Sequence, residues 1–148
     1  MEKQIRHSIF FPQQPEQVWE FITDAELIAQ WLMPNDFKPL PGHEFTFRIS
    51  PMPQFDFDGI VYCKVLEIAA PHKLSYSWKG GPGDGSTNLD SVVTITLSPK
   101  EKGTEMTLVH DRFKVLENLR IFDAMDKGWL QNMHKMAAGL QARHQTVS

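Results

Sequence analysis

Apolar and polar residues alternate with a period of two along much of the chain, which is typical of strands with one buried face. The clearest stretch is 74–78, where Leu74, Tyr76 and Trp78 alternate with two serines. The same alternation predicts further strands at 3–11, 45–49, 57–68, 91–98 and 104–113. We therefore expect an antiparallel sheet of about six strands with one apolar face.

Helical spacing appears directly after the first strand. Pro15 suits the first turn of a short helix, and Val18 and Ile22 fall on one face of it. Asp24 is a typical N-cap for a second helix at 25–32, and Pro34 ends that helix. Two short helices between the first strand and the rest of the sheet are thus predicted.

The C-terminal stretch 119–143 has one apolar stripe at spacings of three and four, typical of a long amphipathic helix. The stripe consists of Phe122, Met125, Trp129, Met133, Met136 and Leu140. This helix is the only large element left to cover the apolar face of the sheet, so the fold class is α+β.

Length, charge and cysteine content narrow the function classes. The chain has 148 residues, enough for one domain over 1–148, and its net charge of −3 is mixed in sign. No basic stripe predicts nucleic-acid binding, and no signal peptide or long apolar run predicts membrane insertion. Cys63 is the single cysteine, which excludes an intrachain disulfide and favours the reducing cytoplasm.

The six histidines show no metal-binding pattern. No two are four residues apart on a predicted helix, and no HExxH word occurs. We therefore expect neither a metal nor a cofactor. His7 and His110 fall on the predicted inner face of strands. Each could bind a ligand or act as an acid or base, or could be a buried histidine satisfied by a neighbour.

Three further features have both a binding and a packing interpretation. Tyr76 and Trp78 could stack on a planar ligand or belong to the core. The methionines of the last helix could line an adaptable pocket or pack on the sheet. Gly128, inside the same helix, could allow a close approach of another element, leave room for a ligand, or be a helix defect tolerated by chance.

Five sequence words together resemble the heat-shock-protein ATPase-activator homologue family, a branch of the START-like (SRPBCC) superfamily. They are PEQVW at 15–19, TDAEL at 23–27, QWLMP at 30–34, GTEMTLVH at 103–110, and Gly128-Trp129 followed by Met133 and Met136. They occur in the family's order and cover nearly the whole chain. The family usually has Arg at His7, Gly at Arg112, and Leu at both methionines.

The resemblance implies a helix-grip fold, in which a curved antiparallel sheet wraps around the long C-terminal helix and encloses a cavity. Relatives are often implicated in binding apolar small molecules. The family takes its name from eukaryotic co-chaperones that stimulate a chaperone ATPase and carry an additional domain.

Our leading hypothesis is non-catalytic binding of a small, largely apolar ligand, lipid-like or aromatic, in that cavity. The candidate cavity residues are His7, Phe47, Val61, Tyr76, Trp78, Val93, Ile95, Leu108, His110, Met125, Trp129, Met133 and Met136. The alternatives are a cavity enzyme of the cyclase or hydrolase type and a co-chaperone-like module with a chaperone partner. Edge strands leave both a monomer and a homodimer open.

Overall fold

The computed structural model describes residues 3–117 and 119–144. In these residues six strands form one antiparallel sheet in the order β1-β6-β5-β4-β3-β2. The strands are β1 (Ile5–Phe11), β2 (Glu44–Arg48), β3 (Ile60–Ala69), β4 (Lys73–Gly80), β5 (Leu89–Lys100) and β6 (Gly103–Leu116). The helices are α1 (Pro15–Thr23), α2 (Ala25–Trp31), the short 3₁₀ turn η1 (Pro53–Phe55) and α3 (Leu119–Arg143).

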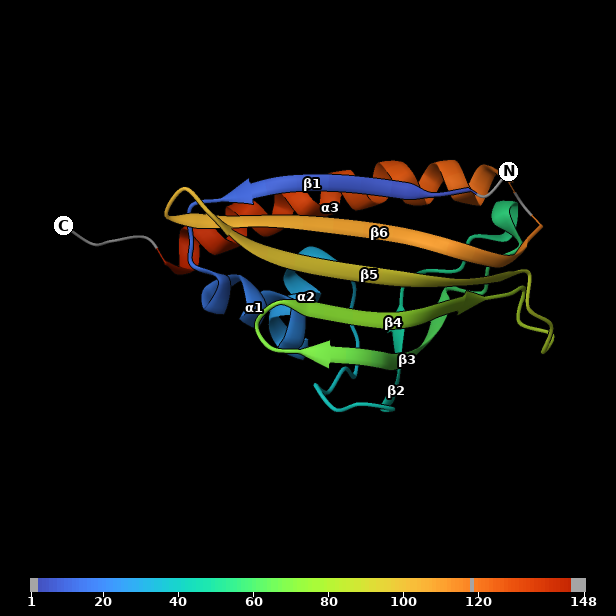
Figure 1. Ribbon diagram of the computed structural model, residues 1–148. Helices are drawn as coiled ribbons and strands as arrows, with labels where there is room; N and C mark the ends of the chain where they lie inside the picture. The colour runs from blue at the N-terminus through green and yellow to red at the C-terminus, as the bar shows by residue number, and fades with distance from the viewer. Residues whose placement is uncertain (1–2, 118, 145–148) are drawn as a thin grey trace.

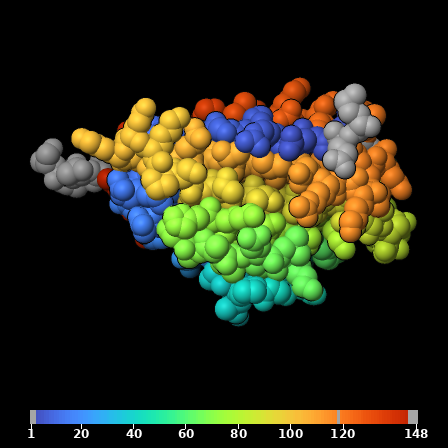
Figure 2. Space-filling model, in the orientation of Figure 1, coloured from blue at the N-terminus to red at the C-terminus, as the bar shows by residue number. Residues whose placement is uncertain are grey.

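The helices cover one face of the sheet. Figure 1 shows α3 running along the sheet behind β1 and β6, with α1 and α2 near its C-terminal end. The side chains of the strands form a continuous outer surface on the opposite face (Figure 2). The predicted helix-grip fold, with two short helices after the first strand and a long C-terminal helix, is confirmed.

The two short helices begin where the sequence predicts. The Asp24 carboxylate accepts hydrogen bonds from the backbone N–H groups of Glu26 (3.0 Å) and Leu27 (3.2 Å), as an N-cap does. The second helix ends at Trp31, one residue earlier than predicted. The Trp31 indole N–H donates to the carbonyl of Phe21 (2.7 Å), so this residue ties α2 to α1.

The inner face follows the predicted alternation. On β3, Val61, Cys63 and Val65 are buried while the residues between them are exposed. On β6, Leu108 and His110 are fully buried. The alternating pattern alone therefore identifies the face of the sheet that meets the helices.

The strand ends differ from the prediction. The prediction placed strands at 91–98 and 104–113, but β5 and β6 extend to 89–100 and 103–116 because they pair along one long hairpin. The turn between these strands has two residues, Glu101 and Lys102, which have positive φ (47° and 66°), as a type I′ turn requires. Pro99 still pairs with Thr104. The strands predicted at 3–11 and 57–68 begin later, at Ile5 and Ile60.

Arg112 has a left-handed backbone conformation, with a φ of 55°. It lies in β6 beside the register shift between Asp90 and Val92 of β5, so the strand bulges at this point. Glycine adopts this conformation without steric cost, whereas an arginine is strained. The bulge is a physical reason for the glycine that the family usually has at this position.

Substitution of Arg112 tests whether its backbone is strained. We expect Arg112→Gly to raise the free energy of unfolding by about 0.5 kcal/mol, because the Arg112 side chain is exposed and the relief of left-handed strain, about 1–2 kcal/mol, exceeds the entropic cost of glycine. Lys114→Gly is the control, since Lys114 is exposed on the same strand without a positive φ. It should lower the free energy of unfolding by about 0.5–1 kcal/mol. Urea denaturation measures both, and a loss of stability in both variants would contradict the strain.

Candidate functional site

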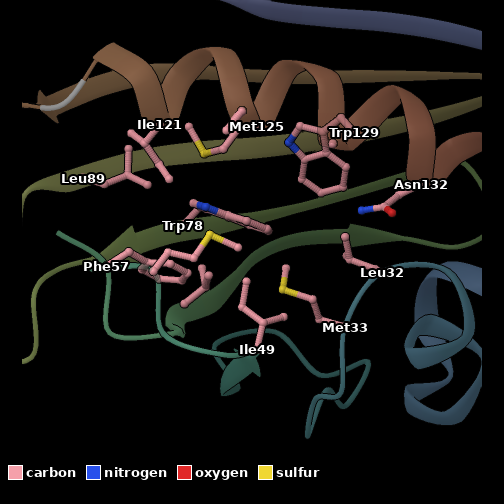
Figure 3. A pocket seen from close by; sticks show the side chains of 14 residues that line it. Leu32, Met33, Ile49, Phe57, Trp78, Leu89, Ile121, Met125, Trp129 and Asn132 are labelled. Carbon is pink, nitrogen blue, oxygen red and sulfur yellow. The ribbon is translucent and has the colours of Figure 1, made fainter. Parts of the chain in front are cut away.

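A pocket of about 270 Å³ lies between the inner face of the sheet and the N-terminal half of α3 (Figure 3). We call it the sheet–helix pocket. Residues from four parts of the chain line it: Val61, Trp78 and Leu89 from the sheet; Ile121, Ala124, Met125, Gly128, Trp129 and Asn132 from α3; Leu32 and Met33 after α2; and Ile49, Met52 and Phe57 from the segment between β2 and β3.

The wall of the pocket is almost entirely apolar. Among the described residues that line it, none has an ionisable side chain, and Asn132 is the one amide. Three lining residues, Met33, Met52 and Met125, have flexible, polarisable side chains that adapt to the shape of a bound group. The pocket therefore suits an apolar molecule and offers no acid or base for catalysis.

One face of α3 forms one wall of the pocket. Ile121, Met125, Gly128 and Asn132 are spaced by four, three and four residues, so they lie on one side of the helix. Our sequence reasoning did not include Ile121 or Asn132 in the site. The helical spacing from Met125 is the signal that would have found both.

The segment between β2 and β3 forms the opposite wall, and it was also missed. Backbone hydrogen bonds hold this segment in place: Ile49 N–H donates to the Gly59 carbonyl (2.8 Å), and Met52 N–H donates to the Phe57 carbonyl (2.8 Å). Nothing in the local sequence indicates where such a loop lies, because its position depends on contacts between residues far apart in the fold.

Two glycines of α3 have different surroundings. A Cβ added at Gly128 would meet nothing within 4 Å, apart from the helix's own neighbouring backbone, and Gly128 lines the pocket. A Cβ added at Gly139 would lie 3.0 Å from Cε2 of Phe21, a fully buried residue of α1. The open space argues against a close approach at Gly128 and is compatible with room for a ligand, whereas close packing describes Gly139.

Four of the candidate cavity residues, Val61, Trp78, Met125 and Trp129, line the pocket. Phe47 and Tyr76 lie behind its wall in an aromatic cluster in which the Phe47 and Trp78 ring centroids are 5.5 Å apart. Desolvation by burial, and to a lesser degree the nearby Cys63, raises the pKa of Tyr76. The remaining apolar candidates are fully buried in the core outside the lining: Val93, Ile95, Leu108, Met133 and Met136.

His7 lies outside the pocket and connects β1 to α3. Its Nε2 is 2.7 Å from Oδ1 of Asp126 and 3.1 Å from the Asp126 backbone carbonyl. Both partners are acceptors, so Nε2 carries the proton and donates to them. His7 therefore has its hydrogen-bond partner on α3, which agrees with the interpretation of a histidine satisfied by a neighbouring residue.

His110 belongs to a buried hydrogen-bond chain behind the pocket. The Trp129 indole N–H donates to Nδ1 of His110 (3.1 Å), and the Ser91 hydroxyl donates to the Trp78 carbonyl (3.0 Å). The remaining contact, 2.7 Å between Nε2 of His110 and Oγ of Ser91, must then use the histidine proton. Every proton in the chain is thus assigned, and the histidine is the neutral Nε2–H form.

Protonation of His110 is strongly disfavoured. Burial lowers its pKa from 6.5 to about 3, because the charged ring would lose its hydration. A second ring proton would also point at the Trp129 N–H, so two donors would meet. His110 is absent from the pocket lining. Its geometry is that of a residue that orients Trp129, rather than of an acid or base.

The described residues contain no group of three or more His, Cys, Asp or Glu side chains placed to hold a metal ion. Burial also raises the pKa of the Cys63 thiol, which keeps it protonated and unreactive. None of the helices in 3–117 and 119–144 is long and apolar enough to cross a membrane.

The lowered pKa of His110 predicts a pH dependence of stability. Between pH 6.5 and about 3 the unfolded chain binds a proton at His110 that the folded protein does not, so stability falls as the pH decreases. The loss is at most about 1.4 kcal/mol per pH unit. We measure the free energy of unfolding with urea at pH 7, 6 and 5. It should fall less steeply with decreasing pH in His110→Gln than in the unmodified protein.

The control for this slope is His72→Gln, because His72 is exposed. Its pH slope should match that of the unmodified protein, since other titrating groups contribute equally to both. If His110→Gln and His72→Gln had the same slope, the buried neutral form of His110 would be refuted.

The two helix glycines predict a difference in stability. Gly128→Ala should raise the free energy of unfolding by about 1 kcal/mol, because alanine favours the helix and its methyl group enters open space. Gly139→Ala should gain less or lose stability, because its methyl group meets the buried Phe21 ring. Thermal and urea unfolding measure both, and equal gains would argue against open space at Gly128.

Comparisons with known proteins give the chain its relatives. The family model described as Activator of Hsp90 ATPase homolog 1-like protein matches residues 12–141. Protein MLL2253 of Mesorhizobium loti is similar at 30% identity and a TM-score of 0.83, over 97% of this chain and 100% of that chain. Protein BH1534 of Bacillus halodurans is similar at 28% identity and a TM-score of 0.72, over 92% and 95%.

CalU16 of Micromonospora echinospora shares the fold at 19% identity and a TM-score of 0.74, over 94% of this chain and 76% of that chain. A search among curated proteins finds no match. The family model covers most of the chain, and the sequence words at 15–34, 103–110 and 128–136 lie inside the matched range. The protein therefore belongs to the family of Activator of Hsp90 ATPase homolog 1-like proteins, within the START-like superfamily.

Proposed function

We propose that this protein binds a small, largely apolar molecule in the sheet–helix pocket without transforming it. The observation that carries the proposal is an apolar pocket of about 270 Å³ whose described lining has no ionisable side chain. Its volume lies just below the range of about 300–1,000 Å³ that is usual for small-molecule sites. A ligand of one or two fused rings, or a short chain, matches this size.

The driving force is the burial of apolar surface. Each Å² of ligand surface removed from water contributes about 25 cal/mol. The rings of Trp78 and Trp129, with centroids 5.2 Å apart, provide broad apolar surfaces against which a ligand can pack. The flexible methionines allow the pocket to close on ligands of somewhat different shapes.

Binding is favoured over catalysis by the placement of the titratable groups. A cavity enzyme needs an acid, a base or a nucleophile that reaches its substrate. His110 is neutral and is turned toward Ser91 and Trp129, and His7 is turned toward Asp126. A chaperone partner is suggested only by the family's name, so the proposal does not depend on one.

The proposal also includes a cytoplasmic location and binding by a single copy of the chain. The single, buried, free Cys63 fits a protein of the reducing cytoplasm. The pocket needs no second copy of the chain, so a monomer suffices for binding.

A thermal-shift screen with two matched variants tests the proposal. The screen uses short-chain lipids and one- and two-ring aromatic compounds, with sterol-like compounds, flavonoids and polyketides as larger members, and a compound that binds only the folded state raises the melting temperature by mass action. Gly128→Leu places a side chain in the pocket, so we expect it to abolish the shift of any compound that binds there.

Gln131→Leu is the matched control, because it adds the same side chain at an exposed position of α3. It should keep the shift seen with the unmodified protein. Shifts that survive in Gly128→Leu would place binding elsewhere on the protein. The absence of any shift, with retention of a chaperone in a pull-down, would favour the protein-interaction alternative.

A further inference from the structure

Three residues contribute the polar side-chain atoms of the pocket wall. Side-chain nitrogen and oxygen atoms of the lining residues belong to Trp78, Trp129 and Asn132 alone within the described chain. The Trp129 N–H is engaged, since it donates to Nδ1 of His110. The Trp78 N–H and the Asn132 amide have no hydrogen-bond partner among the described residues. These two groups remain for a ligand.

Asn132 is placed to meet such a ligand. It follows Gly128 by one helical turn, is half-buried, and reaches from α3 toward the pocket beside the ring of Trp129 (Figure 3). Asn132 is not among the buried side chains that lack a partner, so water can bond its amide in the free protein, and a ligand hydroxyl or carbonyl can take the place of that water. The amide offers both donors and an acceptor, which suits a hydroxyl or a carbonyl group.

The wall of the sheet–helix pocket is unfavourable for a charged ligand group. A carboxylate or an ammonium group buried in an apolar site without a counter-ion loses its hydration at great cost. Arg120 precedes the lining residue Ile121, but its guanidinium donates to the Gln54 carbonyl (2.6 Å) and lies over the Phe55 ring (5.5 Å). The wall therefore favours an uncharged molecule over a carboxylic acid with the same apolar body.

We propose that the pocket selects uncharged molecules with an apolar body and a hydroxyl or carbonyl group, and that Asn132 binds this group. The inference rests on the proposed function and names the chemical class of its ligand. The Trp78 N–H, which has no partner among the described residues, supports the oxygen-bearing group and disfavours a cation, while selection against a carboxylate comes from the uncharged apolar wall.

Three probes with the same two-ring body separate the effects of the apolar body, the hydroxyl group and the negative charge on affinity. They are 2-methylnaphthalene, 2-naphthol and 2-naphthoate at neutral pH, with affinities measured by isothermal titration calorimetry. In the unmodified protein, 2-naphthoate should bind at least tenfold more weakly than 2-naphthol. Asn132→Leu keeps the side-chain size and removes the hydrogen bond. It should weaken 2-naphthol roughly five- to tenfold and leave 2-methylnaphthalene equal or tighter.

The control variant is Gln131→Leu, whose exposed position should leave all three affinities unchanged. If Asn132→Leu weakened 2-naphthol and 2-methylnaphthalene equally, or neither, Asn132 would not bind the polar group. Tightest binding of 2-naphthoate would overturn the selection against charge. Either result leaves the proposed function intact. If none of the probes bound, or if all bound Gly128→Leu as tightly as the unmodified protein, the proposed function itself would fail.

Discussion

The whole structure depends on how a single helix covers the apolar face of a six-stranded sheet. The sheet curves, whereas α3 is one continuous helix, so contact cannot be equally close along its length. In the C-terminal half of α3 the side chains of Met133, Met136 and Leu140 are fully buried, and α1 and α2 close that end. In the N-terminal half Ile121 and Met125 are only partly buried. The pocket lies where the packing of the helix on the sheet is incomplete.

The polar groups on the two sides of the Trp129 ring differ in their hydrogen bonding. Behind its ring, the chain through His110 and Ser91 pairs every donor with an acceptor, which fixes the orientation of the indole. In front of the ring, the Asn132 amide has no described partner. A satisfied network makes a rigid wall, and a half-buried amide without a protein partner gives that wall a chemical preference. Both features would be expected of a site that binds a molecule without reacting with it.

Membership of the family determines the fold more firmly than it determines the activity. The family's name refers to co-chaperones, yet the feature of this chain that carries the strongest physical argument is internal. The pocket is lined from α3, from the sheet and from the segment between β2 and β3, so a ligand would connect elements far apart in the sequence. A ligand in the pocket would therefore also stabilise the folded state.

The sequence by itself determined the elements and their faces. The alternation at Leu74, Tyr76 and Trp78 identified the inner face of β4, and the apolar stripe of α3 predicted a helix with the observed ends. These features are local, because a strand or a helix repeats its buried side at a fixed spacing. The resemblance added the order of the elements around the helix.

Only the tertiary structure decided which inward residues face open space and which are packed. Tyr76 and Trp78 have the same pattern in the sequence, yet Trp78 lines the pocket and Tyr76 lies behind it. The partners of His7 and His110, Asp126 and Trp129, are far from them in the chain. Ile49, Met52 and Phe57 reach the pocket through backbone hydrogen bonds of a loop. A cavity is the space left between elements, so its position depends on the curvature of the sheet and the placement of α3, which no local pattern encodes.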